Sequence, residues 1–399
     1  MLLVTFYAVR HLSLAVYGIF AFCIANLQLF DALIGSALDW SVLKLAPQYR
    51  AEGFRGITPP ERASVLVKMG IAAFILIAIT VPGESIGQAV FHSSGGRPIL
   101  VSLGFSVLGL LAFRSLQCHS LLDFRFRRYG AADLTQTVLR VMLSIGLITA
   151  GISSAAVLVS GYGLAPLAVV LIFSPFLFLE GQTPALWFDP STCMKVLRES
   201  GLLMLIAGFG LLVFNQDMYF LALRRGMAEV GLLRASYTIA FIPELLGTYI
   251  GQAVIPRIVP LCEKGEFEGF YRKFQKWALA GGLVVLVAGL FLVDPVVTRF
   301  FPISYRRTLT IIKILLPAGA ASLIGYPLTL NFLVFYKPKV FLAVDAALAP
   351  FMALGYYFAA SEGGVAAVAW VTCIARLVKF GFTQIYALRL AGRVGPGSA

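Results

Sequence analysis

Charged residues are scarce in this sequence. Asp, Glu, Lys and Arg together make up 13% of its 399 residues, whereas soluble domains carry about 25% charged residues. Hydrophobic residues make up 59%, above the roughly 45–50% of soluble domains. This lack of charge excludes an ordinary soluble protein and indicates an integral membrane protein.

Residues that bind metals or form disulfides are also few. The 5 cysteines are scattered without a CxxC motif, and the 3 histidines have no zinc-like spacing. We therefore expect no metal site and no cofactor, and the cysteines are predicted to be small buried thiols. No long basic segment lies in a soluble domain, so nucleic acid is not an expected partner.

Apolar runs recur along the chain. Many approach the ~20 residues needed to cross a ~30 Å hydrocarbon core, which predicts helical spans and not the short alternation of barrel strands. The predicted fold class is therefore an all-α polytopic membrane protein. Residues 1–10 are apolar but too short to span and form an N-terminal stub. The expected 11 full spans are residues 16–46, 66–91, 98–121, 132–152, 160–180, 198–223, 232–261, 276–299, 307–335, 340–360 and 364–388.

A pause in hydrophobicity at GQTPALWFDPSTCMK divides these spans into two groups. The predicted domains are an N-terminal transmembrane lobe at 1–181, a cytoplasmic inter-lobe linker at 182–197, a C-terminal transmembrane lobe at 198–390 and a disordered tail at 391–399. Net charge is +13, and the cations concentrate in alternate loops, which we expect to be cytoplasmic; Lys68 is counted among these loop cations. The same bias predicts a cytoplasmic C-terminus.

An internal repeat relates the two lobes. Gly18 matches Gly231, and 231 − 18 = 213. The same offset places Asp31 on Glu244, Lys44 on Arg257 and Pro47 on Pro260. We therefore predict two six-helix lobes in a parallel repeat. The offset also aligns residues 1–10 with 214–223, so the first helix is expected to be truncated by roughly 15 residues of a span. A late start codon, a shortened chain or a real loss would each explain this.

Three segments carry a resemblance to a known family: LSLAVYGIFAF at 12–22, FNQDMYFLA at 214–222 and EVGLLRASYTIAFIPELLGTYIGQAVIPRI at 229–258. With the six-plus-six plan, they resemble polysaccharide transporters (Wzx-type flippases) of the multidrug/oligosaccharidyl-lipid/polysaccharide exporter superfamily. The patterns are loose, and the chain departs from the family by lacking most of the first helix.

The resemblance implies a function without enzymatic activity. Such proteins move polyprenyl-diphosphate-linked glycans across the bacterial inner (plasma) membrane for export of surface polysaccharide, such as O-antigen of lipopolysaccharide or exopolysaccharide. Alternating access between two lobes around a cavity is expected. The expected partners are the lipid-linked glycan and membrane lipid, with a polysaccharide polymerase or export machinery as a further candidate.

Depth in the membrane ranks the cations. Charged side chains at the bilayer centre cost about 2.5–3.5 kcal/mol, so they face bundle interiors, cavities or transport paths. Arg140 lies about 13 Å into its span, and Arg376 is similarly deep. Both are predicted to bind a diphosphate headgroup, together with Arg114 nearer the inner leaflet. The alternatives are ion pairs with Asp31 or Glu244 and, for Arg114, snorkelling to the surface.

Acidic residues in the spans are candidates for coupling or gating. Glu244 follows Pro243, which is expected to kink its helix, and Asp31 shares its place through the repeat. Either acid is a candidate for Na⁺ or H⁺ binding or for pairing with an arginine. Asp217 is included, although its depth predicts an outer-rim position beside Arg224 and Arg225. Lys313 and Asp345 are interpreted as shallow interface residues.

Three other functions fit parts of the pattern. A multidrug or metabolite exporter of the same superfamily is expected to have a cavity rich in carboxylates and aromatics. A membrane glycosyltransferase or polymerase is expected to carry acidic motifs in large outer loops, whereas the outer loops here are short and mostly basic. A non-transporting remnant or partner subunit would fit the truncated first helix.

Overall fold

The structure, a computed structural model, describes residues 2–51, 56–92, 96–174, 189–263, 266–330 and 338–391. Within these ranges every element is a helix and no strand is present, so the predicted all-α class is confirmed. Contacts divide the chain into two compact units: His11–Leu212, and Val4–Arg10 together with Val213–Ala399. The short helix α1 (Leu2–His11) therefore groups mainly with the second unit.

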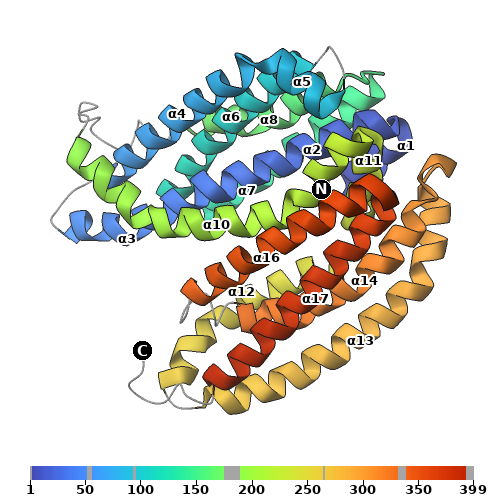
Figure 1. Ribbon diagram of the computed structural model, residues 1–399. Helices are drawn as coiled ribbons and strands as arrows, with labels where there is room; N and C mark the ends of the chain where they lie inside the picture. Colours follow the sequence, from blue (N-terminus) through green and yellow to red (C-terminus); the bar gives the residue numbers. More distant parts are fainter. Residues whose placement is uncertain are drawn as a thin grey trace. The chain divides into compact units, whose positions relative to one another are not determined.

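The first unit is built around α6 (Gly96–Leu122), which packs against α4, α8 and α7 (Figure 1). Of the 18 most apolar consecutive residues of α6, 67% are buried, against 22% for the corresponding stretches of α4 and of α7. Helix α6 is therefore the core of this unit, while α4 and α7 present apolar faces outward to lipid. The other elements are α2 (Leu14–Phe30), η1 (Asp31–Ser36), α3 (Ala37–Ala51), α4 (Pro59–Thr80), α5 (Gly83–Phe91), α7 (Phe126–Thr149), α8 (Ala155–Phe173) and the first part of α10 (Pro190–Arg225).

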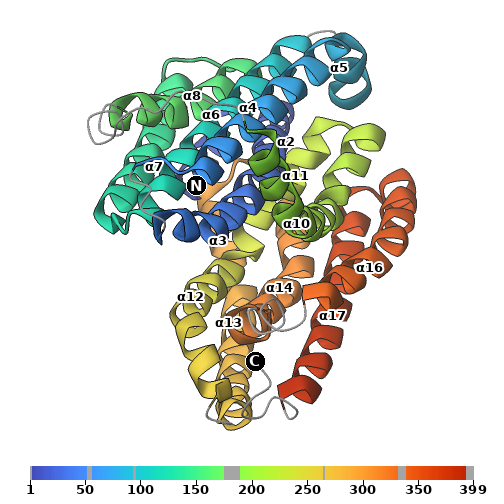
Figure 2. The same cartoon turned by 90° about the vertical axis from the view of Figure 1, so that its left-hand side faces the viewer.

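The second unit is built around α14 (Thr308–Gly325), which packs against α11, α12, α13 and α17 (Figure 2). Of the 18 most apolar consecutive residues of α14, 67% are buried, whereas only 17% of the corresponding stretch of α13 are buried. Helix α13 therefore forms an outer, lipid-facing wall. The remaining elements are α11 (Met227–Ala240), α12 (Ile242–Glu263), α13 (Phe267–Phe300), η2 (Ile303–Tyr305), η3 (Tyr326–Leu330), α16 (Pro338–Phe358), η4 (Ala359–Gly363) and α17 (Gly364–Ala391).

Breaks divide several predicted spans. The single span expected over 66–91 is wrong, because the chain forms α4 and then α5 after Pro82. Proline lacks a backbone N–H and crowds the preceding turn, which ends the helix. The kink expected at Pro243 is present, since α11 and α12 meet there at a bend of 48°.

Eight described helices are long and apolar enough to cross a membrane, or up to ten if each bent pair is one span. Both numbers treat Leu342–Ala391, which contains most of α16 and all of η4 and α17, as one span. It folds back at Gly364, whose φ of +67° is readily adopted by glycine. Lys379 on α17 accordingly reaches Asp345 on α16. The predicted 11 full spans with a stub stay a prediction.

The starts of several helices follow the predicted offset of 213. Helix α2 begins at residue 14, and 14 + 213 = 227 is where α11 begins. Helices α6 and α7 begin at 96 and 126, which map to 309 and 339, one residue past the starts of α14 and α16. This register supports the internal repeat, which stays a prediction.

Residues 182–188 of the predicted linker and 392–399 of the predicted tail lie outside the described residues. Residues 190–197 already form the start of α10, and the two units divide further along this helix, after Leu212. Asp189 caps α10, accepting bonds from the Thr192 hydroxyl at 2.5 Å and the Ser191 amide at 2.9 Å. These bonds lower the pKa of Asp189 below its usual 3.8, so the cap is present above that value and is lost as pH falls through the lowered pKa.

Candidate functional site

The first unit holds a chain of polar side chains within its membrane-spanning helices. Arg114 on α6 forms a bidentate pair with Asp31 at the start of η1; its Nε donates to Oδ1 at 2.6 Å, and a second nitrogen donates to Oδ2. Its Nη1 donates to Gln117 at 3.1 Å, and the Gln117 amide donates to Asp133 on α7 at 3.0 Å. The charge of Arg114 is therefore already compensated by Asp31.

Gly35 permits the close approach of these two side chains. A Cβ at this position would lie 2.8 Å from Oδ1 of Asp31 and 3.3 Å from Cγ of Arg114. The wide turn of η1 and the missing side chain at Gly35 together make room for the planar pair. Local backbone structure thus positions the first predicted coupling residue, Asp31.

Arg140 on α7 has a different environment. Its guanidinium lies over the ring of Tyr162 on α8, 4.4 Å from the centroid. Among the described residues no carboxylate forms a salt bridge with Arg140, and its buried Nε has no hydrogen-bond partner there. The ion pair with Asp31 that was considered for Arg140 is not formed among the described residues of this unit, where Asp31 pairs with Arg114. Arg140 is thus a largely buried cation that stacks on an aromatic ring and forms no direct ion pair among the described residues.

Lys68 and Asp39 form a second pair in the first unit, which sequence reasoning missed. Lys68 is completely buried on α4 and pairs with Asp39 on α3, with Ser115 on α6 at 3.4 Å. Its interpretation as a loop cation is wrong, because α4 begins at Pro59 and places Lys68 in its third turn. The sequence did contain a signal for this pair, because Asp39 and Lys68 are opposite charges in neighbouring apolar runs.

In the second unit Arg376 on α17 pairs with Glu244 on α12 at 2.6 Å. Its guanidinium also lies 3.9 Å from the ring centroid of Phe241, at the bend before Pro243. The ion-pair interpretation of Glu244 therefore describes this structure. An ion pair beside the bend therefore connects α12 to α17.

Asp217 on α10 is fully buried, so it does not form the surface pair with Arg224 or Arg225 that an outer-rim position implies; its depth in the membrane stays a prediction. Its carboxylate accepts bonds from the Tyr237 hydroxyl and, at 2.7 Å, from the Met218 amide. Thr372 lies 3.2 Å from the Tyr237 hydroxyl and 3.1 Å from that of Tyr356. The position of Asp217 in the sequence predicts its depth along the helix axis. It does not predict burial, which depends on the face of α10 that packs against α11 and α17.

No cation forms a salt bridge with Asp217 among the residues described in the second unit. Arg225, expected beside it, instead donates to the carbonyls of Ala360 and Ser361 at 2.7 and 2.6 Å. Asp217 is therefore a buried acid held by neutral donors. In the described ranges no group of three or more His, Cys, Asp or Glu residues is arranged to hold a metal ion.

Asp345 is also buried within the protein, and its predicted depth at the membrane interface stays a prediction. It is 1% exposed and pairs with Lys379, 9% exposed, at 2.5 Å. The antiparallel packing of α16 and α17 brings the two together from 34 residues apart. Lys313, by contrast, forms an exposed pair with Asp294 at 2.8 Å.

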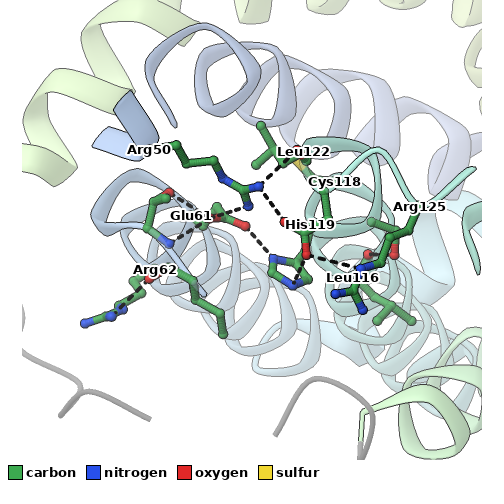
Figure 3. A network of polar contacts seen from close by, with 12 residues as sticks. Arg50, Glu61, Arg62, Leu116, Cys118, His119, Leu122 and Arg125 are labelled. Atoms are coloured by element: carbon green, nitrogen blue, oxygen red, sulfur yellow. Dashed lines mark hydrogen bonds and ion pairs between the residues drawn. The ribbon is translucent and has the colours of Figure 1, made fainter. Parts of the chain in front are cut away.

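A separate network joins the ends of α3, α4 and α6 (Figure 3). Glu61 closes the first turn of α4 by accepting from Thr58, and it lies 2.7 Å from Nδ1 of His119. Arg50 on α3 pairs with Asp123 at 2.5 Å, and Asp123 lies 3.4 Å from Nε2 of His119. These contacts fix the end of α6 and the turn that follows it.

Residues 1–261 match the family described as "Polysaccharide biosynthesis protein". No curated protein sequence matches the chain. The match covers the first unit and part of the second, including Asp31, Arg114, Arg140, Asp217 and Glu244.

Solved structures share the fold. The structure titled "Lipid II flippase MurJ, inward closed conformation" is 11% identical with a TM-score of 0.76, over 98% of this chain and 87% of that one. An inward-facing multidrug resistance MATE family transporter of the MOP superfamily is 14% identical with a TM-score of 0.67, over 97% and 94%. A MOP superfamily transporter from Pyrococcus furiosus is 13% identical with a TM-score of 0.54, over 94% and 88%. At these identities the likeness concerns the fold.

Proposed function

Because the chain belongs to the polysaccharide biosynthesis protein family, we propose that it flips a polyprenyl-diphosphate-linked oligosaccharide across the membrane by alternating access of its two lobes. The observation that carries this proposal is Arg140, a cation within a membrane span that no carboxylate neutralises among the described residues. A diphosphate that crosses the bilayer needs a fixed cation, and guanidinium stays charged and donates two parallel bonds.

The charge balance in the first unit favours an anionic substrate. Asp31 and Asp39 are neutralised by Arg114 and Lys68, and Asp133 accepts a bond from the neutral Gln117 amide, so Arg140 is the cation of this group that has no direct ion pair among the described residues. A multidrug exporter of cationic compounds would instead be expected to have uncompensated carboxylates near its binding site. The same balance gives Arg114 a supporting role, since it binds phosphate only if it shares or releases Asp31.

Arg376 is the corresponding headgroup candidate of the second unit. It is held by Glu244 at the bend preceding Pro243. We propose that exchange of Arg376 between Glu244 and substrate accompanies movement of α12 relative to α17. Asp31 has the equivalent gating role through its pair with Arg114.

The remaining parts of the proposal concern the cell. The bacterial inner membrane is the proposed location, with the C-terminus in the cytoplasm, as the loop cations indicate. The proposed product is surface polysaccharide, and a polysaccharide polymerase or export machinery is the proposed partner. The protein is proposed to have no enzymatic activity.

Asp217 is the proposed coupling residue, because it is fully buried and unbalanced by a salt bridge among the described residues. Such an acid is a place for a proton or sodium ion to bind during transport. Asp217→Asn keeps the side-chain size and removes the charge that the ion requires. We expect downhill exchange of lipid-linked glycan to persist while acceleration by an imposed Na⁺ or H⁺ gradient is lost.

Exchange rates in proteoliposomes with and without each gradient measure this coupling. Asp294→Asn, which removes an exposed acid of the same unit, is the matched control and should keep its gradient response. An Asp217→Asn variant that responds to the gradient like the wild type would contradict the coupling role.

Leaflet exposure of lipid-linked oligosaccharide in cells tests the proposed function. In cells without this protein, and without a redundant transporter, the outer-leaflet pool should fall while the inner-leaflet pool accumulates. Restoring the gene should reverse both changes. Unchanged exposure in the two leaflets would overturn the flippase proposal.

A further inference from the structure

The turn between α6 and α7 exposes two aromatic rings among arginines. Phe124 is 79% exposed and Phe126 is 62% exposed, and the two rings pack edge to face at 6.3 Å. Arg125 and Arg127 beside them are exposed as well. Helices α6 and α7 are both membrane-spanning by length and composition, so this turn lies where a span leaves the hydrocarbon core.

Phe124 has a left-handed backbone conformation, which is unfavourable for a residue with a side chain. Phe124 has a φ of +54°, and it closes α6 in a Schellman motif. Its amide donates to the Leu121 carbonyl at 3.0 Å, and the Arg125 amide donates to the Ser120 carbonyl at 2.9 Å. Glycine is the usual residue at this left-handed position because a Cβ is disfavoured there. An exposed ring in strained backbone is not explained by the stability of the helix end.

Neighbouring contacts hold the turn in place. Asp123 is fixed by Arg50 at 2.5 Å, and it lies 3.7 Å from Nε of Arg125. Arg128 on the far side donates to the carbonyl of Phe173 at 3.0 Å. Figure 3 shows Arg50, His119 and Arg125 converging on this end of α6. The rings and Arg127 therefore project from a fixed base.

We propose that residues 124–128 form a binding site for an anionic glycerophospholipid of the surrounding bilayer. The Phe124 and Phe126 rings enter the boundary between headgroups and acyl chains, where phenylalanine is favoured. Arg127 and Arg125 donate to the lipid phosphate, and the negative surface potential of such lipids adds to this attraction. The aromatic pair and the cations thus match the apolar and charged parts of one lipid. The site does not depend on the proposed transport substrate.

Native mass spectrometry of the full-length protein in detergent, titrated with phosphatidylglycerol, tests the site. We expect Arg127→Gln to lower the affinity of the tightest phosphatidylglycerol site about fivefold, the contribution of one cation at an anionic surface. Arg97→Gln removes an exposed cation from the opposite end of α6 and should leave that affinity unchanged. Phosphatidylcholine, with no net charge, should bind more weakly to the wild type. Equal binding of phosphatidylglycerol by wild type and Arg127→Gln would overturn the proposal.

Phe124→Gly separates lipid binding from folding. Glycine adopts the left-handed backbone without strain, so the variant should unfold in neutral detergent at the wild-type temperature or above it. Its phosphatidylglycerol affinity should nevertheless fall, because the ring is gone. A variant that is as stable as the wild type and binds phosphatidylglycerol equally well would contradict a role for this ring.

Discussion

Arg140→Gln is expected to lower the rate of glycan-lipid transport by about ten- to a hundredfold. A hydrogen bond to a charged group is worth about 1.5–3 kcal/mol, and this variant removes the guanidinium proposed to bind the diphosphate. Stability should change little, because Arg140 has no salt bridge to lose among the described residues and only the Tyr162 ring stacks on it. Initial transport rates and unfolding curves of the purified variant provide the two measurements.

Two variants control this experiment. Arg140→Lys keeps the charge but loses the planar fork, so its rate should lie between those of the wild type and Arg140→Gln. Arg97→Gln removes an exposed cation from the end of α6 and should transport at the wild-type rate. Full transport by a well-folded Arg140→Gln protein would remove this residue from the headgroup site.

Lys379→Met is expected to destabilise the protein by about 3–5 kcal/mol, which is the cost of leaving one partner of a buried ion pair alone. Asp345, which is 1% exposed in the intact pair, would be left without its cation. The two residues hold α16 against α17, so loss of the pair should loosen this hairpin. The free energy of unfolding of the purified protein measures the effect.

The double variant Lys379→Met with Asp345→Leu should recover most of that loss, because a buried ion pair replaced by apolar side chains is often neutral. Lys313→Met breaks the exposed pair with Asp294 and should cost no more than about 1 kcal/mol. A double variant as unstable as Lys379→Met alone would show that the cost comes from packing around Lys379 and not from an unpaired Asp345.

Hydropathy predicted the class of the fold and the approximate place of most helices, because membrane spans must be long and apolar. It did not predict the break at Pro82, since one proline in an apolar run either kinks a helix or ends it. The bend before Pro243 was predicted from the same residue type. Proline alone therefore does not distinguish the two outcomes, which depend on how the following turn packs.

The partners of the buried charges were harder to predict. Asp31 and Glu244 occupy matching places in the predicted repeat, and each pairs with an arginine. Arg114 lies on α6 and Arg376 lies on α17, and the offset of 213 does not match these two helices with each other. The predicted repeat therefore does not extend to the partner arginines. Asp217 shows the same limit, since depth along a helix says nothing about the face on which a side chain lies.

The most direct test of the account uses purified protein in vesicles that carry a fluorescent polyprenyl-diphosphate oligosaccharide in both leaflets. A membrane-impermeant quencher removes the outer-leaflet signal at once. With wild-type protein a second, slower loss should follow as inner-leaflet lipid is flipped outward, and Arg140→Gln should slow that phase about ten- to a hundredfold. A protected signal that stays as constant as in protein-free vesicles would contradict the proposal that this chain is a lipid-linked glycan flippase.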